Sequence, residues 1–280
     1  MIVTALLTGV LPGDVFSQNT RGSLSFVIPY HLDEPEDVYK LPHSLDEISG
    51  LAIDPDGRLI AIQDEQAILF FIDPLSGEIK DEYEFGKRGD FEGVEFMNGL
   101  YYVLESDGTL FQVEIREGES ESSKIKTRLH RGCDAECLAA DVYMYRLLIL
   151  CKEKAGKGIR NARAVYIFDL QKGKLSKKPL NLLSRNAFMS AFDVKKSAFS
   201  SFKPSAIAVH PQTGHIYIIS SVDRRLVVFN RVGDILGQHE FDKKNMRQPE
   251  GLAFGRDGFL YVASEGAGKR GTILRFRPVK

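Results

Sequence analysis

The sequence predicts an all-β fold, a single β-propeller built from four-stranded antiparallel blades. Three features predict it: a short motif that recurs along the chain, glycine-containing turns between apolar runs, and the lack of amphipathic helical stretches between most of those runs. Each repeat of such a fold buries its apolar face against neighbouring repeats, so the repeats belong to one domain. We expect that domain to span residues 22–280.

The recurring motif consists of Ser or Glu, a small residue, an aliphatic residue and usually Ala. Its five copies are Ser49-Gly50-Leu51-Ala52, Glu92-Gly93-Val94-Glu95, Glu136-Cys137-Leu138-Ala139, Ser205-Ala206-Ile207-Ala208 and Glu250-Gly251-Leu252-Ala253. Their second residues are separated by 43, 44, 69 and 45 positions, and propeller blades recur about every 40–50 residues. The long interval indicates an insertion near residues 182–202, which we expect to form either a helix or an irregular loop.

Turn chemistry separates the strands within a repeat. In the first repeat, strands are expected at residues 51–54, 58–63, 67–73 and 78–85. Two of the connections are Pro55-Asp56-Gly57 and Pro74-Leu75-Ser76-Gly77, and glycine supplies the positive φ that tight hairpin turns need. The inner strands are almost continuously apolar, which is typical of sheets covered on both faces.

Closure of the ring needs a strand from the beginning of the chain. The last repeat supplies only three strands, which would leave an unpaired sheet edge. Two strand-like runs lie near the N-terminus, at residues 24–30 and 37–42, and we expect one of them to complete the last blade. Five repeats then form a five-bladed ring. Six blades are the alternative, if these runs and the insertion build a further blade.

Composition and the N-terminal segment restrict the setting and the partners. Lys and Arg number 37 against 38 Asp and Glu, and this balance argues against a general nucleic-acid binder. Residues 1–21 resemble a secretory signal without a basic leading region, the alternative being a frayed or packed strand. Their apolar run is too short to cross a bilayer, and no other segment approaches the length of a transmembrane helix. We expect a monomer in the periplasm or outside the cell.

Three cysteines, Cys133, Cys137 and Cys151, imply no disulfide framework, because an odd number cannot all pair within the chain. Cys133 and Cys137 also lack the second Cys or His pair of a structural zinc site. We expect buried thiols, with a single bridge as the alternative.

Propeller topology brings distant residues together at one end of the central axis. The residues that open the first strand of each repeat are Ser49, Glu92, Glu136, Ser205 and Glu250. The residues two positions earlier are Glu47, Asp90, Asp134, Lys203 and Gln248. Because residues i and i−2 of an extended strand point the same way, six carboxylates are expected around the mouth of the axial channel. They are those of Glu47, Asp90, Glu92, Asp134, Glu136 and Glu250.

Carboxylates packed this closely cannot all remain ionised without protons, basic partners or a bound cation. Ligands that are all oxygen favour a hard ion, and we expect Ca²⁺, with Mg²⁺ less suited. Glu92, Glu136 and Glu250 are the expected ligands, helped by Asp90, Asp134 or Glu47. The alternative is that these residues cap backbone N–H groups and are neutralised by Lys203 and arginines. Basic loops on the same face, such as residues 152–163, either clamp an anionic ligand or are simply solvated.

Several segments resemble a known family. They are Leu45-Asp46-Glu47-Ile48-Ser49-Gly50-Leu51-Ala52, Asp90-Phe91-Glu92-Gly93-Val94-Glu95 and Pro249-Glu250-Gly251-Leu252-Ala253-Phe254, the last followed by Asp257-Gly258 and Leu260-Tyr261-Val262. Together they resemble the SdiA-regulated family of bacterial propellers over residues 40–277, and the last is also similar to the NHL repeat. The resemblance implies a propeller, a bacterial envelope setting and a plausible bound calcium more than any activity. Ser49 and Ser205 depart from a complete ring of Glu, which disfavours a symmetric metal site.

Two functions are compatible with these features. One is a binding protein that holds a divalent cation at the axial mouth and a small ligand or a protein on that acidic face. The other is a hydrolase similar to calcium-dependent lactonase and esterase propellers, in which the metal polarises a carbonyl or activates water. Such enzymes mix Asn and His with the carboxylates near the metal, and the expected ring has neither, which favours the binding protein. The sequence contains no G-x-S-x-G, H-E-x-x-H or P-loop motif.

Overall fold

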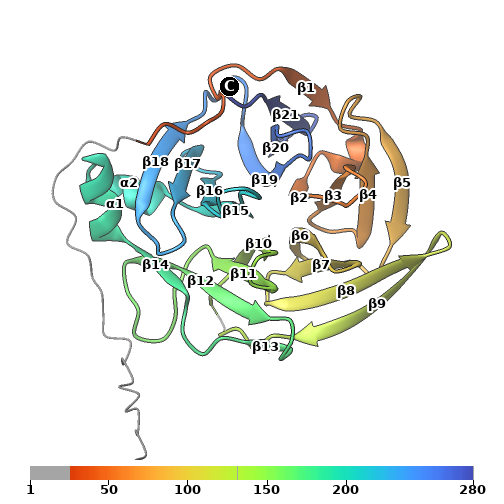
Figure 1. Ribbon diagram of the computed structural model, residues 1–280, viewed down its shortest axis with the longest axis horizontal. Helices are drawn as coiled ribbons and strands as arrows, with labels where there is room; N and C mark the ends of the chain where they lie inside the picture. Colours follow the sequence, from red (N-terminus) through yellow and green to blue (C-terminus); the bar gives the residue numbers. More distant parts are fainter. Residues whose placement is uncertain (1–25, 131, 280) are drawn as a thin grey trace, which may run out of the picture.

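Five antiparallel sheets stand around a central axis in the computed structural model, which describes residues 26–130 and 132–279 (Figure 1). Each sheet contains four strands, except that the third carries a fifth. The fold is therefore a five-bladed β-propeller, as the recurring motif predicts, and the six-bladed alternative is wrong. The signal-like segment expected at residues 1–21 lies outside the described residues.

Four blades follow the chain order of their strands, with the first strand nearest the axis (Figure 1). Blade 1 consists of β2 (Ile48–Ile53), β3 (Leu59–Gln63), β4 (Ile68–Ile72) and β5 (Ile79–Glu84). Blade 2 consists of β6 (Phe91–Met97), β7 (Leu100–Glu105), β8 (Thr109–Arg116) and β9 (Glu119–Lys126). Blade 3 consists of β10 (Ala135–Asp141), β11 (Arg146–Cys151), β12 (Ala162–Asp169), β13 (Lys174–Leu175) and β14 (Asn181–Ser184). Blade 4 consists of β15 (Pro204–Val209), β16 (Ile216–Ser220), β17 (Arg225–Phe229) and β18 (Ile235–Glu240).

The beginning of the chain closes the fifth blade. This blade consists of β19 (Gln248–Phe254), β20 (Leu260–Glu265) and β21 (Thr272–Phe276), with β1 (Asp37–Lys40) as its outer strand. β1 runs antiparallel to β21, with Val38 opposite Leu274. The other candidate run contributes a single bridge, between Tyr30 and Pro278. Closure by one N-terminal strand is confirmed, and β1 provides it.

Buried side chains form five clusters, one at each interface between neighbouring blades. Between blades 1 and 2, the ring of Phe71 meets those of Tyr83 and Tyr101 edge-on, at centroid distances of 5.3 and 5.4 Å. Aromatic pairs favour this edge-to-face arrangement over a face-to-face stack. Because each cluster draws on two blades, the blades depend on one another for their stability.

Every innermost strand carries a β-bulge at the same place. The register shifts fall between Ile48 and Gly50, Phe91 and Gly93, Ala135 and Cys137, Pro204 and Ala206, and Pro249 and Gly251. A bulge leaves one residue outside the ladder and re-aims its side chain. In each blade that residue is the Ser or Glu that opens the recurring motif, so the motif specifies a bulge as well as a strand.

The small residue after the bulge is required by the neighbouring blade. A Cβ on Gly93 would lie 2.9 Å from the backbone nitrogen of Leu138 in blade 3. A Cβ on Gly50 would lie 3.1 Å from the backbone nitrogen of Val94 in blade 2. These distances are shorter than ordinary van der Waals contacts, so a side chain would push the innermost strands apart. Glycine in a strand often marks such a close approach of two backbones.

The long third interval contains β14 and two short helices. α1 (Arg185–Phe192) begins after Ser184, whose Oγ accepts a hydrogen bond of 3.1 Å from a backbone N–H of the first turn. α2 (Lys196–Ser201) follows, and Phe188 and Phe199 pack edge-on between blades 3 and 4. Of the two expectations for the insertion, the helix is the one that forms. Neither these helices nor any other among the described residues is long and apolar enough to cross a membrane.

The cysteines form one bridge. Cys133 and Cys151 are bonded, with their Cα atoms 5.0 Å apart, and Cys137 is a buried free thiol. The bonded pair become neighbours because β10 and β11 place Ala135 opposite Cys151. The single-bridge alternative therefore applies to Cys133 and Cys151, and the expectation of a buried thiol holds for Cys137.

Candidate functional site

The five bulged residues, Ser49, Glu92, Glu136, Ser205 and Glu250, form a ring at one end of the axis, which we call the inner ring. Figure 1 shows the strands that carry them gathered around the centre of the disc. Glu92, Ser205 and Glu250 border a small cavity there, together with the residues that follow each bulge. The cavity offers about 10 Å³ to the centre of a water molecule, roughly the room that one water needs.

Burial and mutual repulsion act on all three carboxylates of the inner ring. The pKa of Glu92 is raised to about 9 by burial, and then by the charges of Glu136 and Asp90. The pKa of Glu250 is raised to about 8 by burial and by the charge of Glu136. Burial also raises the pKa of Glu136, although a hydrogen bond from Lys152 opposes this. The structure thus brings the three carboxylates close enough to interact, although they come from three separate blades.

Among the described residues, Lys152 is the cation that lowers the pKa of all three carboxylates. Its Nζ lies 2.8 Å from Oε1 of Glu136, and the two side chains are 29% and 6% exposed. Burial opposes the charge on Lys152, but the hydrogen bond to Glu136 and the charges of Glu250 and Glu92 outweigh it and raise its pKa above the usual value. One ammonium therefore faces three carboxylates, which leaves two negative charges in excess when all are ionised.

The two serines of the inner ring differ in their partners. The Oγ of Ser205 donates a hydrogen bond of 2.6 Å to the backbone carbonyl of Pro249. Ser49 is only 8% exposed, and its Oγ has no hydrogen-bond partner within the part of the chain that the structure describes. Buried hydroxyl groups are nearly always hydrogen-bonded, so the Ser49 hydroxyl calls for a water molecule or an ion at this place.

The three other predicted ligands, Glu47, Asp90 and Asp134, form an exposed outer ring. Each of their backbone carbonyls accepts a hydrogen bond from the residue that follows the second strand of the same blade, at 3.3, 2.9 and 3.0 Å. The bulge begins after these positions, so the outer ring stays exposed while the next motif residue turns inward. Asp90 still raises the pKa of Glu92 and Glu136, and Asp134 raises that of Glu136.

The ends of the second strands add further carboxylates to this face. The pKa of Asp64 is raised by burial and by Glu47, and that of Glu265 by burial, Glu47 and Asp64. Oδ1 of Asp64 is buried and has no hydrogen-bond partner among residues 26–130 and 132–279. Blades 1 and 5 therefore share a second group of interacting acids, which strengthens the negative potential of the axial face.

Several cations of the surrounding loops are engaged elsewhere. Lys203, the lysine that the alternative interpretation assigned to neutralising the ring, forms an ion pair with Glu153. Arg163 is buried and donates two hydrogen bonds to the backbone carbonyl of Phe202, at 3.2 and 2.9 Å. Arg225 forms ion pairs of 3.1 and 2.9 Å within blade 4. These pairings leave the excess negative charge of the inner ring in place.

Glu95 is a further acid on β6, the innermost strand of blade 2, and was not among the predicted ligands. The other four blades have Ala at its motif position, each at most 4% exposed. Burial raises the pKa of Glu95 to about 8, and hydrogen bonds from the backbone N–H groups of Ala140 and Phe96 oppose this. The departure from Ala in an otherwise regular motif is the signal by which the sequence could have revealed this residue.

The spacing of the acidic groups bears on which ion they fit. Among the described residues, only His130, Cys133 and Cys151 bring three ligand atoms within 4.8 Å of one another, and two of these atoms form the disulfide. The inner ring is therefore more widely spaced than that limit. Ca²⁺ bonds oxygen at about 2.3–2.6 Å and readily completes its shell with water, whereas Mg²⁺ needs about 2.0–2.1 Å in a near-ideal octahedron. An ion held here would therefore need water in its shell, and the irregular geometry of an open ring suits Ca²⁺ better than Mg²⁺.

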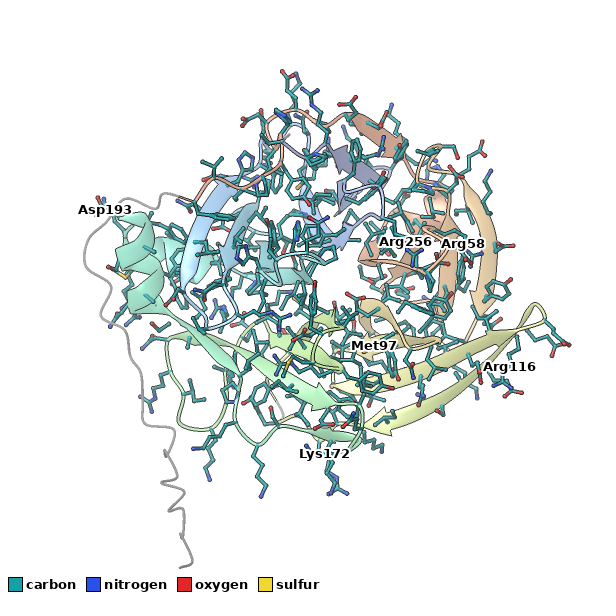
Figure 2. The ribbon with its side chains drawn as sticks, in the orientation of Figure 1. Arg58, Met97, Arg116, Lys172, Asp193 and Arg256 are labelled. Carbon is teal, nitrogen blue, oxygen red and sulfur yellow. A yellow bond between two sulfur atoms is a disulfide. The ribbon has the colours of Figure 1, made fainter. Side chains whose placement is uncertain are left out.

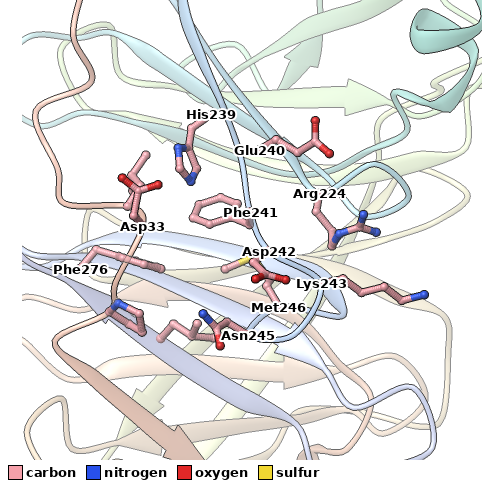
Figure 3. A pocket seen from close by; sticks show the side chains of 13 residues that line it. Asp33, Arg224, His239, Glu240, Phe241, Asp242, Lys243, Asn245, Met246 and Phe276 are labelled. Atoms are coloured by element: carbon pink, nitrogen blue, oxygen red, sulfur yellow. The ribbon is translucent and has the colours of Figure 1, made fainter.

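A separate cavity of about 530 Å³ lies between the outer parts of blades 4 and 5 (Figure 3). Its apolar lining includes Phe241 and Phe276, and its polar lining includes both acidic and basic side chains. Figure 3 shows Arg224 and Lys243 beside Asp242, so charges of both signs gather on one side of this cavity. No residue of the inner ring lines it, and it is distinct from the axial site.

Comparisons with known proteins agree with this architecture. The sequence profile of the SdiA-regulated family matches residues 37–267. No curated protein matches the chain.

Solved structures with similar folds include several enzymes. The glutaminyl cyclase of Myxococcus xanthus is 12% identical, with a TM-score of 0.56 over 87% of this chain and 95% of that one. A luciferin-regenerating enzyme is 12% identical, with a TM-score of 0.54 over 88% of this chain and 96% of that one. The PQQ-bound aldose sugar dehydrogenase of Streptomyces coelicolor is also 12% identical, with a TM-score of 0.51 over 87% and 99%. At this identity the similarity shows the propeller fold alone.

Proposed function

The chain belongs to the SdiA-regulated family, and from that premise we propose that it is a binding propeller of the bacterial envelope that holds a divalent cation, Ca²⁺, in its inner ring. A small ligand or a protein then binds over the same acidic face. Neither the family nor the fold supplies an activity, because one fold hosts many functions. The proposal therefore rests on the chemistry of the inner ring.

The charge balance of the inner ring carries this proposal. Glu92, Glu136 and Glu250 face a single ammonium, that of Lys152, in partly buried surroundings. The remaining two negative charges match one divalent cation. Without such an ion, the repulsion among the carboxylates is relieved only when some of them are protonated. The raised pKa values of Glu92 and Glu250 correspond to this protonated state.

A second, independent observation supports a bound species at the same place. The hydroxyl of Ser49 is buried in the inner ring without a hydrogen-bond partner among the described residues. Its oxygen is a suitable ligand for a hard cation, directly or through water, as are the carboxylates of the ring. An ion or its bound water would satisfy this hydroxyl, whereas a proton shared between two Glu side chains would not do so by itself.

A cation in this ring would face solvent on the side of the outer ring. Glu47, Asp90 and Asp134 are exposed there, and the charges of Asp90 and Asp134 act on the carboxylates of the inner ring. Coordination positions of the ion that no protein atom occupies are open to water or to an oxygen atom of a ligand. We infer that the ligand or partner carries such an oxygen, because the negative face itself would repel an uncoordinated anion.

The disulfide supports a location outside the cytoplasm. Cys133 and Cys151 are joined, and disulfides persist mainly in oxidising compartments such as the periplasm. Calcium is also used by extracellular modules with dissociation constants of about 10⁻⁴–10⁻³ M, a range that an open and hydrated site is suited to.

Thermal unfolding in EDTA, followed by addition of Ca²⁺, tests the proposed cation site. A ligand that binds only the native state stabilises it by about 2.7 kcal/mol at 100 times its dissociation constant, which corresponds to roughly 5 °C or more in a chain of this size. Wild type is expected to show this shift. The double variant Glu92→Gln/Glu250→Gln is expected to lose it, and Glu121→Gln, on the exposed strand β9, is expected to keep it.

Two outcomes would reject this site. The absence of any shift in wild type would remove the ion, and an equal shift in the double variant would place the ion elsewhere. A panel of lactones and aryl esters, assayed with the Ca²⁺-loaded protein, separates binding from the hydrolase alternative. No turnover is expected, and turnover that disappears in EDTA would replace the binding function with hydrolysis.

A further inference from the structure

A groove of about 800 Å³ lies between the outer strand of blade 2 and the outer part of blade 3, far from the inner ring in the fold. Figure 1 shows the end of β9 beside β13, the two strands that flank it. Residues 126–130, 156, 157, 159 and 173–179, together with Tyr166, contribute to its lining. We call it the basic groove, because its charged lining residues are Lys126, Arg128, Lys157, Lys174, Lys177 and Lys178.

An irregularity in the fourth strand of blade 3 builds one wall of this groove. The N–H of Ser176 donates to the carbonyl of Ile167 at 2.7 Å, and pairing resumes where the N–H of Leu180 donates to the carbonyl of Val165 at 2.7 Å. On β12, one residue, Tyr166, lies between the two acceptors, Val165 and Ile167. On the outer strand, three residues, 177–179, lie between the two donors. The segment Lys177-Lys178-Pro179 therefore loops out of the strand opposite Tyr166.

The charges of the basic groove have no counter-ions within the part of the chain that the structure describes. None of its six cationic side chains lies within 4.0 Å of a carboxylate of the described residues, and no Asp or Glu lines the groove. The whole chain has a net charge of −1, so this concentration does not follow from composition. Six like charges around one concavity attract an anion.

The floor of the basic groove is apolar. Leu129, Ile159, Tyr166 and Leu175 line it, and the hydroxyl of Tyr166 is occupied by a hydrogen bond of 2.8 Å to the carbonyl of Ala155. A cavity of this size lies within the range of small-molecule sites, about 300–1,000 Å³, which combine an apolar lining with a few polar groups. The cavity of Figure 3 differs, because acidic and basic side chains lie together around it.

We propose that the basic groove binds a small amphipathic anion, whose apolar body lies on the floor and whose negatively charged head group contacts Lys177 and Lys178. A single molecule suits this shape better than a nucleic acid, because a nucleic-acid site needs a basic stripe along an extended surface. A concave apolar floor also requires an apolar body to displace its water. Phosphate, sulfonate and carboxylate heads share the required charge, and the lysines do not distinguish them by geometry.

Two fluorescent naphthalenes provide a matched test, because they differ in one charged group. 1-Anilinonaphthalene-8-sulfonate carries the anionic head, and N-phenyl-1-naphthylamine has the same apolar body without it. Titrations are made in EDTA, so that the inner ring plays no part. Wild type is expected to bind one sulfonate per chain, about tenfold more tightly than the neutral compound, with an affinity that falls as salt is added. Octyl phosphate, below its aggregation concentration, is expected to displace the sulfonate, and octanol is not.

Variants locate the binding in the groove. Lys177→Gln/Lys178→Gln is expected to weaken binding of the sulfonate about tenfold and to leave the neutral compound unchanged. Lys195→Gln/Lys196→Gln provides the matched control, an adjacent and exposed lysine pair in the insertion, and is expected to bind as wild type does. Circular dichroism and thermal unfolding confirm that both double variants are folded.

Three results would overturn the proposal. They are equal affinity for the two naphthalenes, unchanged sulfonate binding in Lys177→Gln/Lys178→Gln, or equal weakening in the control pair. Displacement of the sulfonate by duplex DNA or anionic vesicles, but not by monomeric octyl phosphate, would also overturn it in favour of a polymer or a membrane surface.

Discussion

The inner ring and the basic groove each concentrate charge of one sign, but the charges of the ring are partly buried and those of the groove are exposed. Three carboxylates of the ring are partly buried around one ammonium, so their charge is costly and their pKa values rise. The six cations of the groove stand at its exposed walls, with no carboxylate of the described residues within 4.0 Å. Buried excess charge therefore acts on the stability of the protein, whereas exposed excess charge acts mainly on what the protein attracts.

Removal of one lysine from each region should give the largest contrast. Lys152→Met leaves the carboxylate of Glu136, which is 6% exposed, without its partner. We expect a loss of about 3 kcal/mol in the free energy of unfolding near pH 8, because an uncompensated buried charge remains. Lys177→Met, in the basic groove, should change it by less than about 0.5 kcal/mol. Urea unfolding in EDTA measures both, and equal losses would contradict the contrast.

The stability of the ion-free protein should also depend on pH through the inner ring. The folded-state pKa values of Glu92, about 9, and Glu250, about 8, lie above the ordinary 4.5, so the folded state holds protons that the unfolded state has released. This stabilisation is complete below about pH 4.5 and disappears as the pH rises through about 8 and 9. Wild type should therefore lose stability between about pH 6 and pH 9, by about 1.4 kcal/mol per pH unit for each of the two carboxyls until the pH passes its folded-state pKa.

Urea unfolding across that pH range provides the measurement. Glu92→Gln/Glu250→Gln should have a shallower profile, because glutamine does not titrate and only other raised carboxyls, such as that of Glu95, still release protons. Lys177→Gln/Lys178→Gln should keep the slope of wild type, since lysines of the basic groove stay charged throughout. A rise in wild-type stability toward pH 9 would show that the carboxyl groups of the inner ring are not protonated in the folded protein.

Glu95→Ala should have only a small effect on stability. The variant gives blade 2 the residue that the other four blades have at this motif position. It removes a carboxyl with a pKa raised to about 8, together with its hydrogen bonds to the backbone N–H groups of Ala140 and Phe96. These two changes oppose each other, so the free energy of unfolding should change by less than about 1 kcal/mol near neutral pH. A loss above about 3 kcal/mol in urea unfolding would identify Glu95 as a structural anchor between blades 2 and 3.

The blade repeat was predictable because its causes are local. The small residue after each bulge recurs once in each blade, and glycines recur in the turns between strands. A last blade with only three strands predicts that a strand from the N-terminal part of the chain completes it. β1 is that strand. The sequence left the insertion open between helix and loop, because its short helices depend on contacts of Phe188 and Phe199 with blades 3 and 4.

The candidate site was predictable only in outline. The motif predicts that Glu92, Glu136 and Glu250 approach one another, and in the structure the charge of Glu136 acts on both Glu92 and Glu250. It does not predict the bulge, which separates the inner ring from the outer ring. Nor does it predict that Lys152, and not Lys203, is the neutralising cation, since that choice depends on how the strands of blade 3 end.

The disulfide and the basic groove are two further features that the sequence alone does not predict. Cys133 and Cys151 are paired by the register of β10 and β11, which the sequence does not reveal. Lys177 and Lys178 leave the ladder because three residues of the outer strand lie opposite Tyr166. Both features follow from strand register, a property of two segments together.

A crystal structure of the protein grown with Ca²⁺ above pH 8 tests the central claim most directly. We predict one ion on the axis, identified by anomalous scattering, with carboxylate oxygens of Glu92, Glu136 and Glu250 at about 2.3–2.6 Å or one water away. The ammonium of Lys152 would remain on Glu136 or move toward solvent. An axis that contains only water and Lys152 under these conditions would contradict the account.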